Sequence, residues 1–359
     1  MATAPVLTER PSKNLNLIPL AQLPGFRALL WNKNQLYISR GYSLYKTSVA
    51  GFEISCEFVA RFSPPVWRVL TSQFRLSSRV FRDGFHTLAA LRSGHLIAAV
   101  PGAILARSPG ETEFKISHRI TRGTRPLHIT LTPDDRVFWG EYFDNRERAR
   151  VNIYSSSDCG NWWNMVYTFS RGEIRHVHNI VYDPWQDCMW ILTGDNGSEC
   201  RIVRSSCDFS HVENVLIGSQ QTRAAALVPT PRGIVFSTDT PSQQNHVYRL
   251  DRTGNLEKLA DLSSSSICAC AVGDSLFFST MAEPSSINTA KEVRLYGSAD
   301  GSNWKTLLQY QKDRWPMGPF QYGNIFLPDG ANNSGVLALT TCAVTGADSV
   351  TSLWTVQRE

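Results

Sequence analysis

The sequence predicts an all-β protein, and within that class a β-propeller of seven blades. Helical periodicity is nearly absent. Short alternating runs rich in Val, Ile, Phe, Tyr and Trp lie between clusters of Gly, Pro, Asn, Asp and Ser, which is typical of strands. These runs group in fours. An apolar pair followed by Ser or Asp also returns at intervals of roughly 45 to 60 residues, the period of propeller blades.

The groups of strands follow one another along the chain. They lie near residues 25–62, 85–120, 127–169, 176–217, 223–262 and 267–310, and a last group at 320–356 supplies only three strands. The run Asn16–Leu23 has the character of an outer strand, and we expect it to complete the last blade and close the ring. Closure leaves only short edges unpaired. A six-bladed ring, with 318–358 as a closing sheet, is the alternative.

Residues 15–359 are predicted to form a single domain. Residues 1–14 are polar, contain two prolines and are expected to form a flexible tail. Residues 64–83, between the first two blades, are enriched in Arg and Ser and predict an insertion that forms a lid or a short helix.

Composition narrows the classes of partner and compartment. The net charge is +5 without any run of five basic residues, which disfavours nucleic acid as a partner. No run approaches the ~18 apolar residues of a membrane span. Eight cysteines show no C-x-x-C pair, and the start of the chain lacks an apolar signal core. Free thiols without a signal peptide predict a reducing cytoplasm.

One motif occurs twice. Residues 156–163 read S-x-D-x-G-x-x-W between two alternating apolar runs, and a shortened copy spans 298–304. On these motifs the chain resembles the BNR/Asp-box propellers of the sialidase-like superfamily. In that family the box is a structural turn, so the resemblance assigns Asp158, Trp163, Asp300 and Trp304 to the fold. The Arg-Ile-Pro motif of true sialidases is absent, and the resemblance therefore implies a glycan-directed propeller that is not a sialidase.

Polar residues recur where a propeller gathers its loops around one face of the axis. Carboxylates follow the second strands of four successive blades, and histidines, arginines and other polar groups begin the first strands. Convergence of such groups on a concave face is what a polar ligand site requires. The candidate catalytic residues are Glu141, Asp195, Asp239, Glu283 and His178. The candidate substrate-binding residues are His86, Arg125, His128, Tyr142, His176, Arg223, Lys312 and Tyr322.

Histidine spacing adds a candidate metal site. His176 and His178 alternate along a strand and therefore lie on one face, and His128 has the matching position in the preceding blade. These three could bind a divalent metal, the only cofactor that the sequence indicates, with Glu141, Asp195 or Gln221 adding an oxygen ligand. The arrangement resembles the His-rich centres of propeller polysaccharide lyases.

These candidate residues favour an enzyme, but they do not distinguish between two mechanisms. Hydrolysis needs two carboxyl groups, ~5–5.5 Å apart for retention or ~6.5–9.5 Å for inversion. Lyase chemistry needs a base, for which His128, His178 and Tyr142 are candidates. It also needs a cation, which Arg125, Arg223, Lys312 or a metal would supply. We predict a glycoside hydrolase acting on an acidic or polar glycan. The alternatives are a polysaccharide lyase and a non-catalytic propeller that binds glycan or protein.

Overall fold

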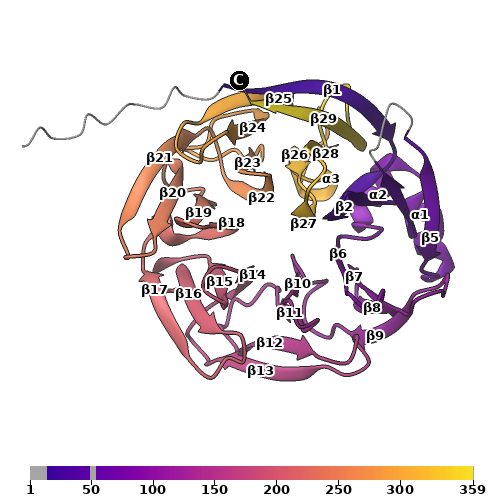
Figure 1. The fold of residues 1–359 in the computed structure, drawn as a ribbon, viewed down its shortest axis with the longest axis horizontal. Coiled ribbons are helices and arrows are strands. Elements are labelled where there is room, and N and C mark those ends of the chain that lie inside the picture. Colours follow the sequence, from indigo (N-terminus) through magenta and orange to yellow (C-terminus); the bar gives the residue numbers. More distant parts are fainter. Residues whose placement is uncertain (1–13, 49–53, 359) are drawn as a thin grey trace, which may run out of the picture.

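The chain forms a closed ring of β-sheets. The structure, a computed structural model, describes residues 14–48 and 54–358. Within this part of the chain, seven sheets surround a central axis (Figure 1). The seven-bladed propeller is therefore confirmed, and the six-bladed alternative is wrong. The tail predicted at 1–14 lies almost wholly outside the described residues.

The second to sixth blades are antiparallel sheets of four strands that run outward from the axis in chain order, and β2 to β5 of the first blade follow the same plan. The first four blades are β2 (Arg27–Lys33), β3 (Gln35–Arg40), β4 (Ser43–Ser48) and β5 (Cys56–Arg61); β6 (Thr87–Ala90), β7 (Leu96–Val100), β8 (Ala103–Arg107) and β9 (Lys115–Arg119); β10 (Thr130–Leu131), β11 (Val137–Gly140), β12 (Val151–Ser156) and β13 (Asn164–Phe169); and β14 (His176–Asp183), β15 (Cys188–Gly194), β16 (Arg201–Ser206) and β17 (Val212–Ile217).

The fifth and sixth blades follow the same plan, and the seventh combines the two ends of the chain. The strands are β18 (Ala224–Thr230), β19 (Gly233–Thr238), β20 (Asn245–Asp251) and β21 (Leu256–Leu262); β22 (Ser266–Val272), β23 (Ser275–Thr280), β24 (Glu292–Ser298) and β25 (Lys305–Gln311); and β26 (Asn324–Phe326), β28 (Val336–Cys342), β29 (Val350–Arg358) and β1 (Leu15–Pro24).

The ring closes through the N-terminal strand. β1 pairs antiparallel with β29 from Leu15 opposite Arg358 to Pro24 opposite Val350, as the sequence predicted. A second link between the last and first blades is β27 (Asp329–Asn332), which adds to β2 in parallel. Closure by both ends leaves the first and last blades held together by main-chain hydrogen bonds.

The core lies between neighbouring blades. In β23, Phe277 and Phe278 are adjacent and both fully buried. Successive side chains of a strand point to opposite faces, so Phe277 packs between the sixth and seventh blades and Phe278 between the fifth and sixth. Inner strands are thus buried on both faces, which explains why they read as continuous apolar runs, whereas outer strands such as β21 keep polar, exposed positions.

The first Asp-box motif forms a compact turn between β12 and β13. The Ser156 hydroxyl donates to Asp158 Oδ1 (2.8 Å), which also accepts from the Trp162 amide (2.9 Å). Gly160, at φ +84°, donates its amide to Ser156 Oγ (2.9 Å). The Trp163 indole donates to Ser117 of the neighbouring blade (2.7 Å). The turn thus joins two strands and two blades, while membership of the BNR family stays a prediction.

The segment predicted as an insertion holds two short helices, α1 (Val66–Ser72) and α2 (Arg75–Phe81). They lie between the first and second blades and contact α3 (Met317–Phe320) of the seventh blade through α2. Two 3-10 turns, Gly197–Glu199 and Gln220–Thr222, flank the fourth blade's outer half. Among the described residues, no helix is long and apolar enough to span a membrane.

Candidate functional site

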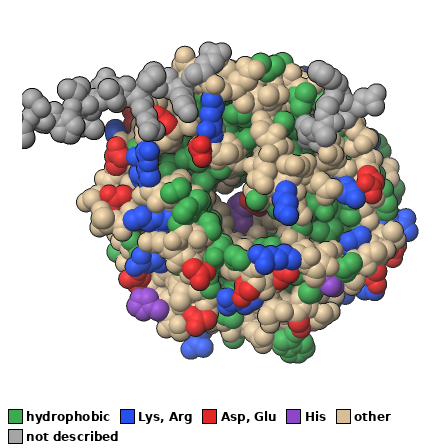
Figure 2. Space-filling view, viewed as in Figure 1, with side chains coloured by type: hydrophobic (Ala, Val, Ile, Leu, Met, Phe, Trp, Pro, Cys, Tyr) green, Lys and Arg blue, Asp and Glu red, His purple; other side chains and the backbone are tan. Residues whose placement is uncertain are grey.

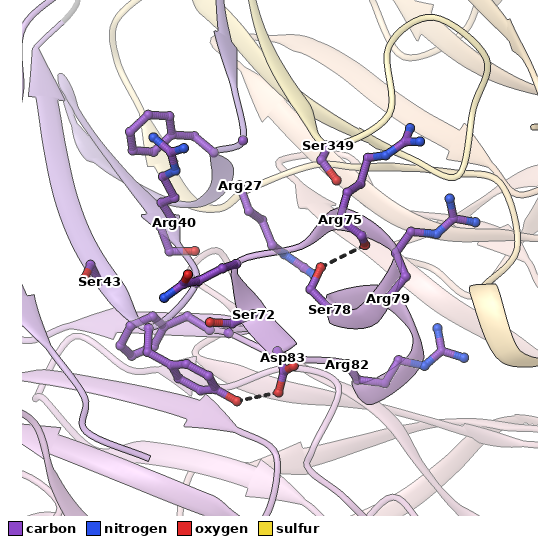
Figure 3. Close-up of a pocket in the computed structure, with 18 of the residues that line it drawn as sticks. Arg27, Arg40, Ser43, Ser72, Arg75, Ser78, Arg79, Arg82, Asp83 and Ser349 are labelled. Carbon is purple, nitrogen blue, oxygen red and sulfur yellow. Dashed lines mark hydrogen bonds between the residues drawn. The ribbon is translucent and has the colours of Figure 1, made fainter. Parts of the chain in front are cut away.

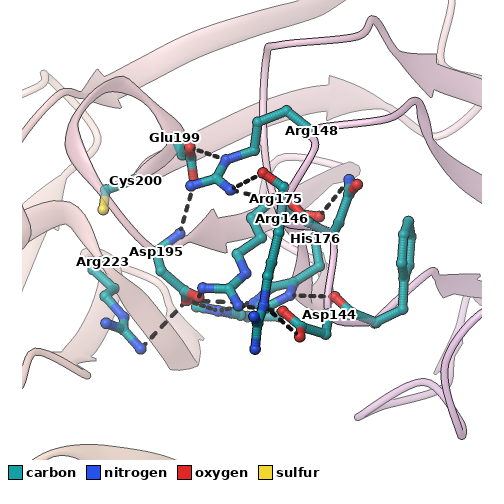
Figure 4. Close-up of polar contacts among 12 residues, drawn as sticks. Asp144, Arg146, Arg148, Arg175, His176, Asp195, Glu199, Cys200 and Arg223 are labelled. Atoms are coloured by element: carbon teal, nitrogen blue, oxygen red, sulfur yellow. Dashed lines mark hydrogen bonds and ion pairs between the residues drawn. The ribbon is translucent and has the colours of Figure 1, made fainter.

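A polar cluster lies at the axial ends of the third, fourth and fifth blades. The space-filling view is hollowed at the centre of the ring, where a histidine is visible (Figure 2). His176 belongs to β14, and Asp195 directly follows β15 (Figure 4). His178 lies two residues after His176 on the same strand. The register of β14 against β15 shifts between Val177 and Asn179, so His178 is the unpaired residue of a β-bulge.

Three side-chain atoms of this cluster converge. His176 Nε2 lies 3.0 Å from His178 Nε2, and these two nitrogens lie 3.3 and 3.2 Å from Asp195 Oδ1. The other nitrogen of each ring faces a main-chain carbonyl: His176 Nδ1 lies 3.1 Å from the oxygen of Phe143, and His178 Nδ1 2.9 Å from that of Ala224. The two imidazoles therefore connect the fourth blade to its neighbours on both sides.

Two arginines bind the carboxylate of Asp195. Arg175 Nη1 donates to Oδ2 (3.0 Å), and Arg223 Nη2 lies 3.3 Å from Oδ1 (Figure 4). Each arginine has a second carboxylate, Asp144 for Arg175 and Asp239 for Arg223. Burial alone would raise the pKa of Asp195, but its contacts with the two imidazoles and the charge of Arg223 hold it well below its usual range. Asp195 is thus a fixed anion.

Burial dominates the protonation of the neighbouring groups. It lowers the pKa of His178 below its ordinary value. It raises the pKa of Asp239 to about 7, and the charges of Glu283 and Asp195 act in the same direction against that of Arg223. At neutral pH the buried imidazole of His178 and the half-protonated carboxyl of Asp239 therefore lie close to Arg223.

Three other predicted residues lie near the cluster without contributing an atom to the convergence of His176, His178 and Asp195. Glu141 is buried, forms a bidentate ion pair with Arg122 and also accepts a hydrogen bond from the Asn152 amide (2.8 Å). Tyr142 packs its ring against the imidazole of His176, with centroids 4.3 Å apart. Glu283 is half-buried and acts on the cluster through its charge.

His128 does not join the other two histidines. Its Nδ1 faces Asp329 at 3.3 Å, a contact to β27, the strand added to β2 of the first blade. Gln221, another predicted ligand, donates its amide to Gln243 (2.8 Å). Among the described residues, His176, His178 and Asp195 form the group whose side-chain atoms lie close enough together to bind one metal ion.

Two further candidates, His86 and Arg125, precede the first strands of the second and third blades. His86 Nε2 donates to the Arg82 carbonyl (2.6 Å), and burial with the charges of Arg125 and Arg27 holds its pKa well below the ordinary value. Burial, reinforced by the charge of Arg27, lowers the pKa of Arg125 to about 9.

The two candidates near the last blade lie apart from the axial cluster. Lys312 donates to the Trp315 carbonyl (2.9 Å) and pairs with Asp313. Tyr322 is exposed. The predicted set is therefore divided between the axial cluster and the surroundings of the helical insertion.

Apart from Arg223, which is among the predicted residues, the sequence did not predict the arginines around the carboxylates. Arg175 directly precedes His176, so its position next to the cluster was visible in the run Arg-His-Val-His. Arg122 and Arg27 come from other segments and carry no such signal. Asp329 lies in β27, the added strand, which the sequence did not predict.

A cavity of about 1050 Å³ lies beside the helical insertion, between the first blade and the loops of the seventh (Figure 3). Six arginines and two aspartates line it: Arg27, Arg40, Arg61, Arg75, Arg79, Arg82, Asp83 and Asp348. The buried Arg79 fastens α2 to the seventh blade, because it pairs with Asp348 (3.0 Å) and Asp313 and donates to the Phe320 carbonyl (2.7 Å).

The outer surface of the two helices is apolar. α1 buries none of its residues. Val66 is 76% exposed, Phe74 68% and Leu70 56%, and Trp67 and Phe81, which contact each other edge to face, are also exposed. A cluster of exposed apolar side chains on one short segment is unusual for a soluble surface and marks sites of interaction.

The chain resembles known proteins in fold alone. No family model and no curated protein matches it. A chain in the crystal structure of the mitotic checkpoint complex has a TM-score of 0.57 and 10% identity, covering 99% of this chain and 96% of that one. The WD40 β-propeller domain of Doa1 has a TM-score of 0.56 and 10% identity, with 95% and 97% covered.

These comparisons overturn the predicted glycoside hydrolase, which was wrong. The similar structures are a WD40 propeller domain and a chain of a protein complex. The predicted glycan substrate is withdrawn together with the hydrolase. In the structure, Glu141 pairs with Arg122, and Asp195 pairs with Arg175. The lyase roles given to the histidines, Tyr142 and the arginines stay predictions.

Proposed function

We propose that this propeller is a non-catalytic scaffold that binds another protein, and that the helical insertion between its first two blades carries the contact. The observation behind the proposal is the exposed apolar surface of α1 and α2, formed by Val66, Trp67, Leu70, Phe74 and Phe81 and called the apolar patch below. The chain's similarity in fold to a WD40 domain and to a chain of a protein complex is a supporting analogy for a role in binding.

The charge around the apolar patch defines the partner. Residues 62–82 contain four arginines and no acidic residue. The adjoining cavity adds Arg27 and Arg40 to its lining, against Asp83 and Asp348. A basic cavity beside an apolar surface fits a segment that carries acidic groups next to apolar anchors, since complementary charge steers the encounter and buried apolar side chains supply the affinity.

The insertion is held firmly enough to present such a surface. Arg68 pairs with Asp83 (2.8 Å), which also accepts from Tyr42 of the first blade (2.9 Å). Arg79 anchors α2 to the seventh blade through Asp348. The apolar patch is therefore fixed on two blades before a partner arrives, which reduces the entropic cost of binding.

A displayed library of random linear peptides tests the proposal. We expect selection against the whole protein to enrich peptides with acidic and apolar residues in alternation. Measured by fluorescence anisotropy, Phe74→Asp and Leu70→Asp should each lower the affinity for such a peptide by about tenfold or more, since the apolar anchors of an interface dominate its affinity. Trp162→Asp is the matched control, because Trp162 is also 69% exposed but lies on the far turn of the third blade.

The salt dependence separates the two parts of the contact. Raising the ionic strength should slow association of an acidic peptide with the arginine-lined cavity, while leaving the apolar contribution to dissociation nearly constant. Peptides that bind equally well to both patch variants, or the absence of any enriched peptide, would rule the helical insertion out as the binding surface.

A further inference from the structure

We infer that His176, His178 and Asp195 form a binding site for a divalent transition-metal ion, and that zinc is the ion this donor set fits best. The inference is independent of the proposed protein contact, since it concerns the axial ends of the third to fifth blades. It rests on the hydrogen-bond roles of the two imidazoles, on the distances among three donor atoms, and on the groups that surround them.

The hydrogen bonds fix which ring nitrogens carry lone pairs. A carbonyl oxygen can only accept, so the Nδ1 atoms that face Phe143 and Ala224 are the protonated ones. A neutral imidazole has one N–H, which leaves both Nε2 atoms as acceptors. They face each other at 3.0 Å, and each faces an oxygen of ionised Asp195, itself an acceptor. Three buried acceptors that converge on one point repel one another, and a cation placed between them would stabilise them.

The separations match a metal site. For bonds of about 2.0–2.2 Å from zinc to imidazole nitrogen and carboxylate oxygen, tetrahedral geometry puts neighbouring ligand atoms roughly 3.3–3.6 Å apart, and a facial octahedral set roughly 2.8–3.1 Å. The observed separations of 3.0, 3.2 and 3.3 Å lie in this span. Two imidazoles and one carboxylate leave a fourth tetrahedral position open, the arrangement of ligand-accepting zinc sites.

The surroundings are those of a supported metal site. Metal-binding histidines almost always donate their second N–H to a carbonyl or carboxylate, and both do so here. Arg175 and Arg223 each pair with a further carboxylate, Asp144 or Asp239, which offsets part of their positive charge. The contacts from the two arginines orient the carboxylate of Asp195.

Gly194 permits the approach of His178. A Cβ at position 194 would lie 2.6 Å from Cε1 and 3.1 Å from Nε2 of that imidazole, so a larger residue would push the ring away from Asp195. All three ligands come from the fourth blade, while their outer hydrogen bonds reach the third and fifth blades. A metal here would therefore lock three neighbouring blades at the axis.

The test measures zinc directly. The full-length protein is stripped with a chelator, dialysed against Zn²⁺ and analysed for metal by mass spectrometry. We expect about one zinc ion per chain, and a decrease of at least about tenfold in His178→Ala and in His176→Ala. His128→Ala is the matched control, since His128 also faces an aspartate near the axis yet lies outside the donor set, and it should keep its zinc.

Cobalt substitution keeps the test decisive if an alanine variant fails to fold. Wild-type protein titrated with Co²⁺ should show the visible bands of low-coordinate cobalt without thiolate charge-transfer absorption, and Zn²⁺ should displace them. The chain has eight free cysteines, so an intense near-ultraviolet thiolate band would assign the metal to them instead. Wild-type protein with less than about a tenth of an equivalent of zinc, or a folded His178→Ala variant with a full equivalent, would overturn the inference.

Discussion

The sharpest test of the packing between blades is the substitution Asp183→Ala. Asp183 ends β14 and is fully buried. Its carboxylate accepts from the Trp185 amide and the Trp190 indole, each at 3.0 Å, and pairs through both oxygens with Arg252 of the fifth blade. One side chain therefore satisfies a turn, a core tryptophan and the neighbouring blade.

The expected loss follows from what remains after truncation. Removing one member of a buried ion pair typically costs about 3–5 kcal/mol, because the other charge stays buried without a partner. Arg252 would keep only its bond to the Thr230 carbonyl, and the Trp190 N–H would lose its acceptor. The matched control is Asp274→Ala. Asp274 also pairs with an arginine, Arg358 at 2.9 Å, but its side chain is 90% exposed, so we expect a loss below about 1 kcal/mol.

Urea unfolding followed by tryptophan fluorescence measures both variants. The free energies of unfolding are comparable if the dependence on urea, the m-value, is unchanged. The double variant Asp183→Ala/Arg252→Ala should lose clearly less than the sum of the single losses, since the unpaired charge is gone. A loss from Asp183→Ala as small as that from Asp274→Ala would refute the reasoning that burial of the pair joins the fourth and fifth blades.

Three further predictions concern single side chains. Burial chiefly raises the pKa of Asp239 to about 7. The proton on Asp239 therefore stabilises the fold fully below about pH 4, the pKa in the unfolded chain, and this stability is lost as the pH rises through about 7. Asp239→Asn should remove this loss. Asp158→Ala should lower the free energy of unfolding by about 1 kcal/mol, since two turn hydrogen bonds disappear. Gly194→Ala should displace His178 and lower the zinc content without unfolding the ring.

Each of these has a measurement that could contradict it. Urea unfolding from about pH 4 to 8 decides the first, and an Asp239→Asn variant with the pH dependence of the wild type would refute it. Thermal unfolding decides the second, where an unchanged Tm for Asp158→Ala would show that the turn does not depend on the carboxylate. Metal analysis decides the third: full zinc in Gly194→Ala would mean that the ring of His178 has room to move.

The fold was predictable because its constraint is local and repeated. Each blade buries both faces of its inner strands, so strands such as β15 and β23 read as apolar runs between turn residues. Asn16–Leu23 could be assigned to the last blade because a three-strand group lacked an outer strand. β27 was missed because it follows Leu327 and Pro328 as a short polar run, and its parallel pairing with β2 depends on closure of the ring.

The site was predictable in outline only. The loop rule correctly brought His176, His178 and Asp195 to one end of the axis, but it does not give the depth of a residue or the direction of its side chain. His128 turns to Asp329 and Lys312 to Asp313 for this reason. The hydrolase prediction rested on a count of carboxylates, and such a count says nothing of the arginines that pair with them.

A charged axial cluster is a weak sign of catalysis in any propeller. Burial on both faces of the inner strands excludes polar residues from the blades, so they gather at strand ends, and the ring brings those ends together. Paired charges such as Glu141 and Arg122 satisfy each other there. Groups left unsatisfied by the fold carry more information: converging lone pairs at His176 and His178 point to a cation, and uncovered apolar side chains at Phe74 and Leu70 point to a protein partner.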